Sequence, residues 1–458
     1  MEQLTALDAS FVYRELPHAP LHVGTVLLYD ATTAPGGTLT FDDVVSAVSR
    51  RLHLAKAFRR RLVTVPMELD HPWWIEDAGF DLTHHVKRAS LPRPGGREGL
   101  FALAAELFAR PLDLARPPWE MHVVDDVGEG QVAVVQKIHH AAVDGLAGME
   151  ILGAIHDRSP DASPPAPGHE WEPERVPPPW ELVARANVHA VSRPLHGADV
   201  LRRVLPRLTA AFGRSADADP TALPPPTRFN GPILSSRVVV GRELELSALR
   251  RARSLVPGSS VNDVVLAVVG GALRRHLGGD LPAAPLVAMV PLSVRRKGDR
   301  GAGGNRVTTM SISLATDLAE PIDRLGAIHR SIKRAKEAAS AVGARELVEY
   351  SETMPGGLVA LAARASSMLA AAPGAGSHSC VVTNVPGPRS PIYLAGARLQ
   401  SIHGLTPPAD GLGLTHTIVT YCGTVAIGVV STPRALPDPQ AYGDALVDAA
   451  EELAGAVR

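Results

Sequence analysis

Apolar residues recur along this chain with two periods, which predict strands and helices in alternation. Short runs rich in β-branched residues predict strands over residues 21–29 and 131–138, and helical spacing predicts helices over 41–51 and 145–156. In the second half we expect helices over 261–277, over 322–339 and from 440, and strands over 237–246, 286–291, 306–315, 381–384, 399–403, 414–421 and 425–431. Mixed strands and helices in two similar halves indicate an α/β architecture with a site between the halves.

A proline-rich stretch separates the two halves. Residues 160–179 hold eight prolines in 20 positions, which favours an extended linker over a helix or a central strand. The chain of 458 residues is also too long for one core, since single cores stop growing at about 250–300 residues. We therefore predict an N-terminal subdomain over 1–160, a connecting region over 161–226 and a C-terminal subdomain over 227–458.

Charge and composition narrow the function classes. The 46 Lys and Arg residues nearly balance 47 Asp and Glu, and a net charge of −1 provides no electrostatic footprint for nucleic acid. With only Cys380 and Cys422, neither a disulfide framework nor a cysteine-rich zinc module can form. The longest apolar stretch, residues 264–273, is far shorter than the roughly 20 residues that span a bilayer, and the N-terminus does not resemble a secretory signal. We expect a cytoplasmic protein that can touch lipid surfaces peripherally without crossing them.

The passage richest in chemistry follows the predicted strand over 131–138. It reads His139-His140-Ala-Ala-Val-Asp144-Gly145, and a helix is expected to begin there. An imidazole at the end of a strand can take a proton from a hydroxyl or a thiol near neutral pH. The simpler interpretation is an aspartate that caps the next helix, with two incidental histidines.

Other kinds of site fit the sequence less well. The doublet His84-His85 has no partner motif that would complete a metal site. No G-x-S-x-G elbow of a serine hydrolase is present, and residues 301–306 fit neither common phosphate-binding loop. A lone general base without a protein nucleophile therefore favours direct transfer of a group to a bound acceptor.

The histidine passage resembles the HHxxxDG signature of CoA-dependent acyltransferases, which include chloramphenicol acetyltransferase, carnitine acyltransferases and peptide synthetase condensation domains. Further stretches resemble the bacterial wax ester synthase/diacylglycerol acyltransferase family: residues 7–11, 21–24, 58–62, 111–120, 229–232, 261–264, 291–295 and 384–388. They occur in order from residue 7 to beyond 430. Leu21 and Cys422 depart from the family's usual residues, and the second departure concerns lipid preference rather than the chemistry.

This resemblance implies a fold and a reaction. The fold would be the two-subdomain chloramphenicol-acetyltransferase-like fold with a central tunnel. The reaction would move a long-chain acyl group from acyl-CoA, a co-substrate, to diacylglycerol or a fatty alcohol, with His140 as general base, no acyl-enzyme and no bound cofactor or metal. Two rivals stay open: an acyltransferase for a natural-product or sugar hydroxyl or amine, and a non-catalytic protein of lipid surfaces.

The resemblance also assigns roles around His140. Asp144 either orients the imidazole, as in a triad, or pairs with a buried arginine; we prefer the pairing, with Arg295 as partner. His139 is expected to pack or to position the loop, with direct chemistry as the alternative. Gly145 would let acyl-CoA or the helix backbone approach closely. Residues 111–120 are expected to pack Trp119 beneath the catalytic strand.

The second half supplies further candidates. Asn262 could stabilise an oxyanion with its carboxamide, although Ser260-Val-Asn-Asp263 also has the form of a helix start. Asn384, Pro386 and Gly387 could contact the acyl-CoA, or could form no more than a turn.

The apolar stretch 357–372 also has two interpretations. A helix that is apolar nearly all round is usually buried, and we prefer that interpretation. The alternative is that one face of this helix lies on a lipid surface.

Overall fold

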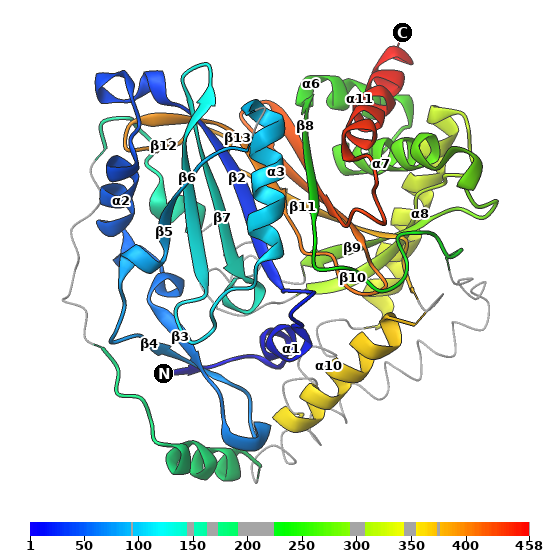
Figure 1. The fold of residues 1–458 in the computed structure, drawn as a ribbon. Helices are drawn as coiled ribbons and strands as arrows, with labels where there is room; N and C mark the ends of the chain where they lie inside the picture. Colours follow the sequence, from blue (N-terminus) through cyan, green and yellow to red (C-terminus); the bar gives the residue numbers. More distant parts are fainter. Residues whose placement is uncertain are drawn as a thin grey trace.

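Two six-stranded mixed sheets lie side by side in the computed structural model of the chain (Figure 1). The structure describes residues 1–92, 95–143, 151–162, 173–190, 224–293, 307–342, 354–372 and 376–457. A smaller sheet of the order β1-β4-β3 lies at the N-terminal end of the chain, formed by β1 (Glu2–Gln3), β3 (Arg60–Val63) and β4 (Trp73–Glu76). The architecture is the mixed α/β, two-subdomain one that the resemblance implied.

The N-terminal sheet has the order β12-β13-β2-β7-β6-β5. Its strands are β2 (His22–Asp30), β5 (Val86–Ala89), β6 (Trp119–Gly128), β7 (Gln131–His139), β12 (Tyr393–Leu394) and β13 (Ala397–Leu405). Two helices, α2 (Phe41–Ser49) and α3 (Gly96–Ala109), pack on this sheet, and α1 (Ala6–Arg14) lies below its strand ends (Figure 1).

The C-terminal sheet has the order β10-β9-β11-β14-β15-β8. Its strands are β8 (Val238–Glu245), β9 (Val287–Ser293), β10 (Val307–Ser313), β11 (Cys380–Pro386), β14 (Leu414–Tyr421) and β15 (Thr424–Ser431). The accompanying helices are α6 (Leu246–Ala252), α7 (Val261–Leu277), α8 (Pro321–Val342) and α11 (Pro439–Gly455). The main core of this subdomain joins the sheet, α7 and α11, and α11 packs both on α7 and directly on the sheet, where Tyr442 contacts His416.

Most predicted elements are present. The strands predicted over 21–29, 131–138, 414–421 and 425–431 are β2, β7, β14 and β15, and the helix predicted over 261–277 is α7 with the same bounds. Of the helix predicted over 145–156, residues 151–155 are helical and 144–150 lie outside the described residues. The sequence patterns did not indicate α1, α3 or β6.

The two sheets do not divide at the proline-rich linker. Strands β12 and β13 follow the linker in sequence, yet β13 pairs antiparallel with β2 of the N-terminal sheet from Arg398 with Asp30 to Leu405 with Gly24. The pairing covers a long edge of β2 that would otherwise expose its backbone groups. The boundaries drawn at 160 and 227 did not anticipate this exchange, which ties the two halves together.

The preferred interpretation of residues 357–372 is wrong. These residues form α10 (Gly356–Ala370), but only Gly356, Ala360 and Ala363 are buried, while the large side chains are exposed. The helix is therefore a surface helix and not part of a core. Among the described helices, none combines the length and the apolar character that a bilayer crossing requires.

Candidate active site

The end of β7 places two adjacent histidines in different surroundings. His139 is the last residue of the strand, pairs with His22 of β2 and is fully buried. Its Nδ1 accepts a hydrogen bond from the Ala141 N–H at 3.2 Å, so the ring proton is on Nε2, which lies 3.3 Å from a carboxylate oxygen of Glu15. The hydrogen bond at Nδ1 thus holds the turn, while Nε2 lies within ion-pair distance of Glu15 without forming a hydrogen bond to it.

His140 begins the short 3₁₀ turn η7 (His140–Ala142), directly after the strand. Its backbone N–H donates to the Leu21 carbonyl at 2.9 Å, and its ring stacks on Phe11 of α1 with centroids 3.9 Å apart and planes 11° apart. The residue is half-buried, in contrast to His139. The stacking fixes the plane of the ring, whose Nδ1 is buried, while the residue as a whole keeps part of its surface exposed.

Burial also sets the protonation state of His140. The surrounding protein lowers the pKa of His140 to about 4, mainly by desolvation, and the neighbouring His139 and Arg14 lower it further. Because this value is well below 7, the imidazole is neutral at physiological pH. A neutral imidazole is the form that can accept a proton.

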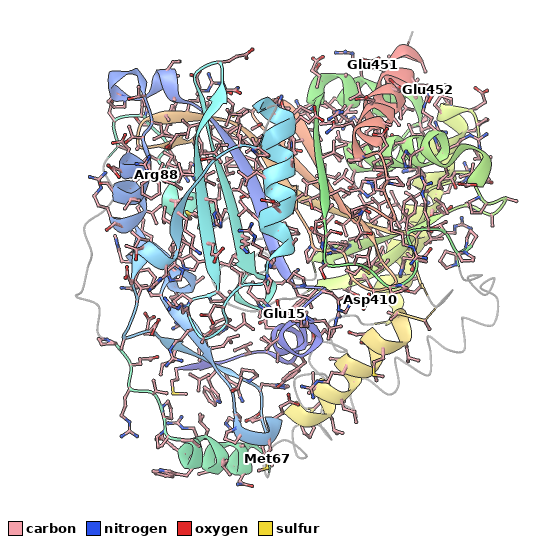
Figure 2. All side chains as sticks on the ribbon, viewed as in Figure 1. Glu15, Met67, Arg88, Asp410, Glu451 and Glu452 are labelled. Carbon is pink, nitrogen blue, oxygen red and sulfur yellow. The ribbon has the colours of Figure 1, made fainter. Side chains whose placement is uncertain are left out.

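Glu15 and Phe11 are the two neighbours that sequence reasoning did not identify as part of this site. Glu15 follows α1 and lies beside it (Figure 2); its other carboxylate oxygen accepts from the Leu21 N–H at 3.2 Å. Phe11 belongs to the stretch 7–11 that resembles the family, so that resemblance was the available signal. Trp119 is fully buried as expected, but it lies beside the catalytic strand, in β6, where it pairs with Ile138 of β7.

Asp144, Gly145 and Arg295 lie outside the described residues. The expected pairing of Asp144 with Arg295, and the close approach expected at Gly145, stay predictions.

The start of α7 shows the helix start that was considered for the stretch 260–263, and the oxyanion role of Asn262 stays a prediction. Ser260 is the helix N-cap and accepts from the Asp263 N–H, while Asp263 also lies 2.7 Å from His329 Nδ1. Asn262 takes no part in this cap. Its side-chain oxygen instead accepts a hydrogen bond from Asn384 Nδ2 at 3.2 Å, so two of the candidate residues meet.

Of the candidate residues after Asn384, Gly387 has a structural reason to be glycine. Pro386 is the exposed last residue of β11. A Cβ at Gly387 would come within 2.4 Å of the Thr420 carbonyl oxygen, and the Gly387 N–H donates to that same oxygen at 3.1 Å. Gly387 is therefore required by the close packing of β11 on β14. The two groups of candidates belong to different sheets: His139 and His140 to the N-terminal sheet, Asn262 and Asn384 to the C-terminal subdomain.

In the histidine pair His84-His85, the buried residue His85 has a structural role. His85 is buried, with Nδ1 2.9 Å from the Trp119 carbonyl oxygen and its ring stacked on Trp119. Within the described ranges, no group of three or more His, Cys, Asp or Glu side chains is arranged to hold a metal ion.

Sequence comparison places these residues in a known family. Residues 4–265 match the sequence model of the wax ester synthase/diacylglycerol acyltransferase catalytic domain, and residues 303–454 match that of the family's C-terminal domain. A Mycobacterium tuberculosis protein with the curated name "putative diacyglycerol O-acyltransferase" is 35% identical over 463 residues, which cover 99% of this chain and 90% of that protein.

Two solved structures share the fold. The wax ester synthase/diacylglycerol acyltransferase from Marinobacter aquaeolei VT8 has a TM-score of 0.69 at 28% identity, covering 99% of this chain and 100% of that one. The starter condensation domain of rhizomide synthetase, solved in complex with C8-CoA and Leu-SNAC, has a TM-score of 0.54 at 16% identity, covering 100% of this chain and 95% of that one. The latter likeness is one of fold alone.

Proposed function

The chain belongs to the wax ester synthase/diacylglycerol acyltransferase family of acyltransferases, and on that basis we propose that it transfers a long-chain acyl group from acyl-CoA to the hydroxyl of diacylglycerol or of a fatty alcohol. The products would be a triacylglycerol or wax ester and free CoA. Acyl-CoA is a co-substrate in this proposal, and no cofactor stays bound.

His140 is the proposed general base. It removes the proton from the acceptor hydroxyl, whose oxygen attacks the carbonyl carbon of the thioester. The tetrahedral intermediate collapses, the carbon–sulfur bond breaks, and the imidazolium returns the proton to the CoA thiolate. No acyl-enzyme forms, and a positioned imidazole of this kind typically contributes about 10²–10⁴-fold to the rate.

The neighbours of His140 support this assignment. Phe11 fixes the plane of the ring, and His139 with Glu15 fixes the turn that carries it. We assign His139 a positioning role because its ring is fully buried, its Nδ1 holds the turn and its Nε2 faces Glu15. Asp144 is proposed to stabilise the loop through Arg295.

Asn262 is the proposed donor to the oxyanion. Since its side-chain oxygen accepts from Asn384, its amide N–H groups remain the part that can face a developing negative charge. Asn384, Pro386 and Gly387 would line the acyl-CoA path through their backbone, and Gly145 would allow a close approach on the other side.

The acceptor proposed here is insoluble in water, so the protein must meet it at the surface of a lipid phase. That requirement adds peripheral lipid contact to the proposed function.

The observation that carries the proposal is the half-buried, neutral His140 stacked on Phe11 directly after the fully buried His139. The test incubates purified protein with palmitoyl-CoA and, separately, diacylglycerol, hexadecanol, a short soluble alcohol, a sugar and an amine, and follows both free thiol and ester. We expect thiol and ester in equal amounts with the first two acceptors. Transfer only to the sugar or the amine would favour a specialised acyltransferase, and no thiol release with any acceptor would contradict catalysis.

A further inference from the structure

Helix α10 differs from an ordinary surface helix because its large apolar residues face solvent and its small residues face the protein. Its buried positions hold only the small residues Gly356, Ala360 and Ala363. Apart from the half-buried Val359, its large apolar side chains face outward: Leu361 is 64% exposed, Met368 78% and Leu369 69%, and Leu358 is exposed as well. With Ala362 and Ala365, which are also exposed, these residues recur at helical spacing along one outer stripe.

The small residues on the inner side have a packing reason. A Cβ at Gly356 would come within 2.6 Å of the Asp70 backbone, and Ala360 and Ala363 share an apolar cluster with Ala9 of α1 and with Ala141. The inner face must therefore stay narrow so that α10 can approach α1 and the turn after His140. No such constraint explains why the outer stripe is large and apolar.

Two further segments expose large apolar side chains beside α10. The loop around η5 (Pro66–Glu68) carries Met67, 81% exposed in a left-handed backbone conformation with φ of 54°, and the exposed Leu69. Such a conformation is costly for a residue other than glycine and indicates that the surroundings hold the loop in place. Helical residues 179–190 carry the exposed stripe Trp180, Ala184 and Val188.

Side-chain ion pairs join all three segments into one end of the molecule. Arg364 of α10 forms a bidentate ion pair with Glu68 of the loop. His189 Nδ1 lies 2.7 Å from the buried Asp70 carboxylate, which connects the helical residues 179–190 to the same loop. Figures 1 and 2 show α10, Met67 and this helix together at the end opposite the C-terminus.

We infer that this end docks on the surface of a lipid phase, through a docking face made of Met67, Leu69, Trp180, Val188, Leu358, Leu361, Met368 and Leu369. These are eight of the twelve large apolar residues with high exposure in the described part of the chain. Apolar surface of this kind, gathered from three segments, marks an interaction site. The inference rests on the proposed function, because an insoluble acceptor requires contact with lipid.

Chemistry favours a lipid surface over a second protein. Trp180 provides the aromatic side chain that prefers the membrane–water boundary. At the rim, the arginines Arg175, Arg185 and Arg364 outnumber their partners Glu68 and Glu181, which suits phosphate headgroups.

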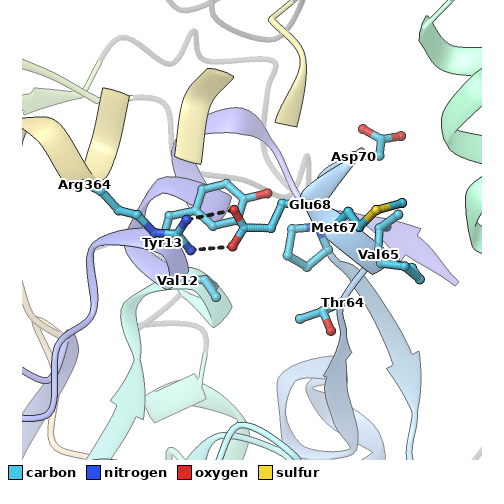
Figure 3. A pocket seen from close by; sticks show the side chains of 10 residues that line it. Val12, Tyr13, Thr64, Val65, Met67, Glu68, Asp70 and Arg364 are labelled. Carbon is cyan, nitrogen blue, oxygen red and sulfur yellow. Dashed lines mark hydrogen bonds and ion pairs between the residues drawn. The ribbon is translucent and has the colours of Figure 1, made fainter. Parts of the chain in front are cut away.

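A cavity adjoins the docking face. It has a volume of about 530 Å³, and Met67, Glu68 and Arg364 line it together with Val12 and Tyr13 of α1 (Figure 3). Helix α1 is also the helix whose Phe11 stacks on His140. The docking face is thus separated from the candidate active site by one layer of packing, which is a suitable arrangement for taking an acceptor from lipid.

The test measures binding of the full chain to phosphatidylcholine vesicles that contain diacylglycerol, by flotation. The variant Leu361→Ser with Leu369→Ser should lower the partition coefficient at least about tenfold, and Met67→Ser should lower it further. Binding of the wild type should persist in 1 M NaCl, because apolar contacts are not screened. The matched control, Leu54→Ser with Ile322→Ser, removes exposed aliphatic side chains elsewhere and should bind as the wild type does.

Activity on two acceptors separates this inference from the proposed function. The Leu361→Ser, Leu369→Ser variant should lose transfer to diacylglycerol in vesicles but keep transfer to a short soluble alcohol, with an unchanged melting temperature. Wild-type protein that does not bind vesicles, or a variant that binds as well as the wild type, would overturn the docking face. Loss of a dimer without loss of vesicle binding would assign the face to a second copy instead. Vesicle binding through the face without thiol release on any acceptor would retain the face and overturn the proposed function.

Discussion

His139 and His140 are adjacent in the chain, but they lie on opposite sides of it and differ in burial and in contacts. On the inner side, His139 is fully buried; its Nδ1 accepts from the Ala141 N–H, and its Nε2 lies 3.3 Å from Glu15. On the outer side, His140 is half-buried, stacked on Phe11 and neutral because burial lowers its pKa to about 4. Since successive residues of a strand point to opposite faces, a doublet at a strand end turns one ring inward and leaves the other residue partly exposed, as the proposed general base requires.

The largest expected effect concerns Asp144, which we assign to the structural side. If Asp144 pairs with Arg295, Asp144→Ala or Arg295→Ala alone should cost about 3–5 kcal/mol of stability, because each leaves a buried charge without its partner. The double variant should lose less than the sum of the two. Additive losses in denaturant titrations would instead give Asp144 an orienting role beside His140.

Replacement of His139 by Ala should lower stability by about 2–4 kcal/mol, because it opens a buried space and leaves the Ala141 N–H without its acceptor. Turnover by the folded fraction should fall less than it does in His140→Ala. His84→Ala, at an exposed position of the other histidine doublet, is the control and should melt as the wild type does. A greater loss of turnover in His139→Ala than in His140→Ala would reverse the two assignments.

Glu15→Gln should cost about 1 kcal/mol, because the amide keeps an acceptor for the Leu21 N–H but weakens the contact with His139 Nε2. The exposed Glu320→Gln is the control for loss of a surface carboxylate. An unchanged melting temperature in Glu15→Gln would mean that the stability of the buried region around His139 does not depend on this contact.

The smallest expected effect is a nearly flat pH dependence. With a pKa of about 4 for His140, kcat/KM should change less than about twofold between pH 7.5 and 5.5, whereas a histidine with an ordinary pKa of 6.5 would lose about tenfold. A tenfold loss in this range would show that a different or more exposed histidine is the base.

The folded state must be intact for that comparison. The buried His156 and His416 also have pKa values lowered to about 4 by desolvation. Because these values lie below those of the unfolded chain, their contribution to stability is complete above about pH 6.5 and is lost as the pH falls towards 4. Circular dichroism at each pH identifies where unfolding begins.

The sequence predicted the parts of the fold that depend on local pattern. Helix α7 begins and ends where predicted, since Ser260 caps its start and Gly278 adopts φ of 51° at its end. Strand pairing between distant segments, such as β13 with β2, has no local signal and could not be predicted.

Helices α7 and α10 illustrate why burial was harder to predict than helix formation. Both are apolar nearly all round, yet α7 is almost entirely buried and α10 exposes its largest residues. The difference is in where the large and small residues lie. Ala360 and Ala363 lie on the same side of α10, and such a grouping of small residues indicates a close contact on that side alone. The total hydrophobicity of the helix does not contain this information and predicts only that the helix is buried.

The residues of the candidate site that form a sequence motif could be predicted, whereas those that meet only through folding could not. The doublet His139-His140 stands out in the sequence, whereas Glu15 and Phe11 reach it only because α1 packs against the turn after β7. The bond between Asn262 and Asn384 likewise requires two segments of the folded C-terminal subdomain to meet.

The most direct test of the central claim compares His140→Ala with the wild type on palmitoyl-CoA and a short soluble alcohol, which removes any dependence on lipid contact. The account predicts a loss of about 10²–10⁴-fold in kcat in a protein that still folds, with a melting temperature lowered only by the lost stacking on Phe11. Near-full turnover in a folded His140→Ala protein would contradict the assignment of His140 as the general base.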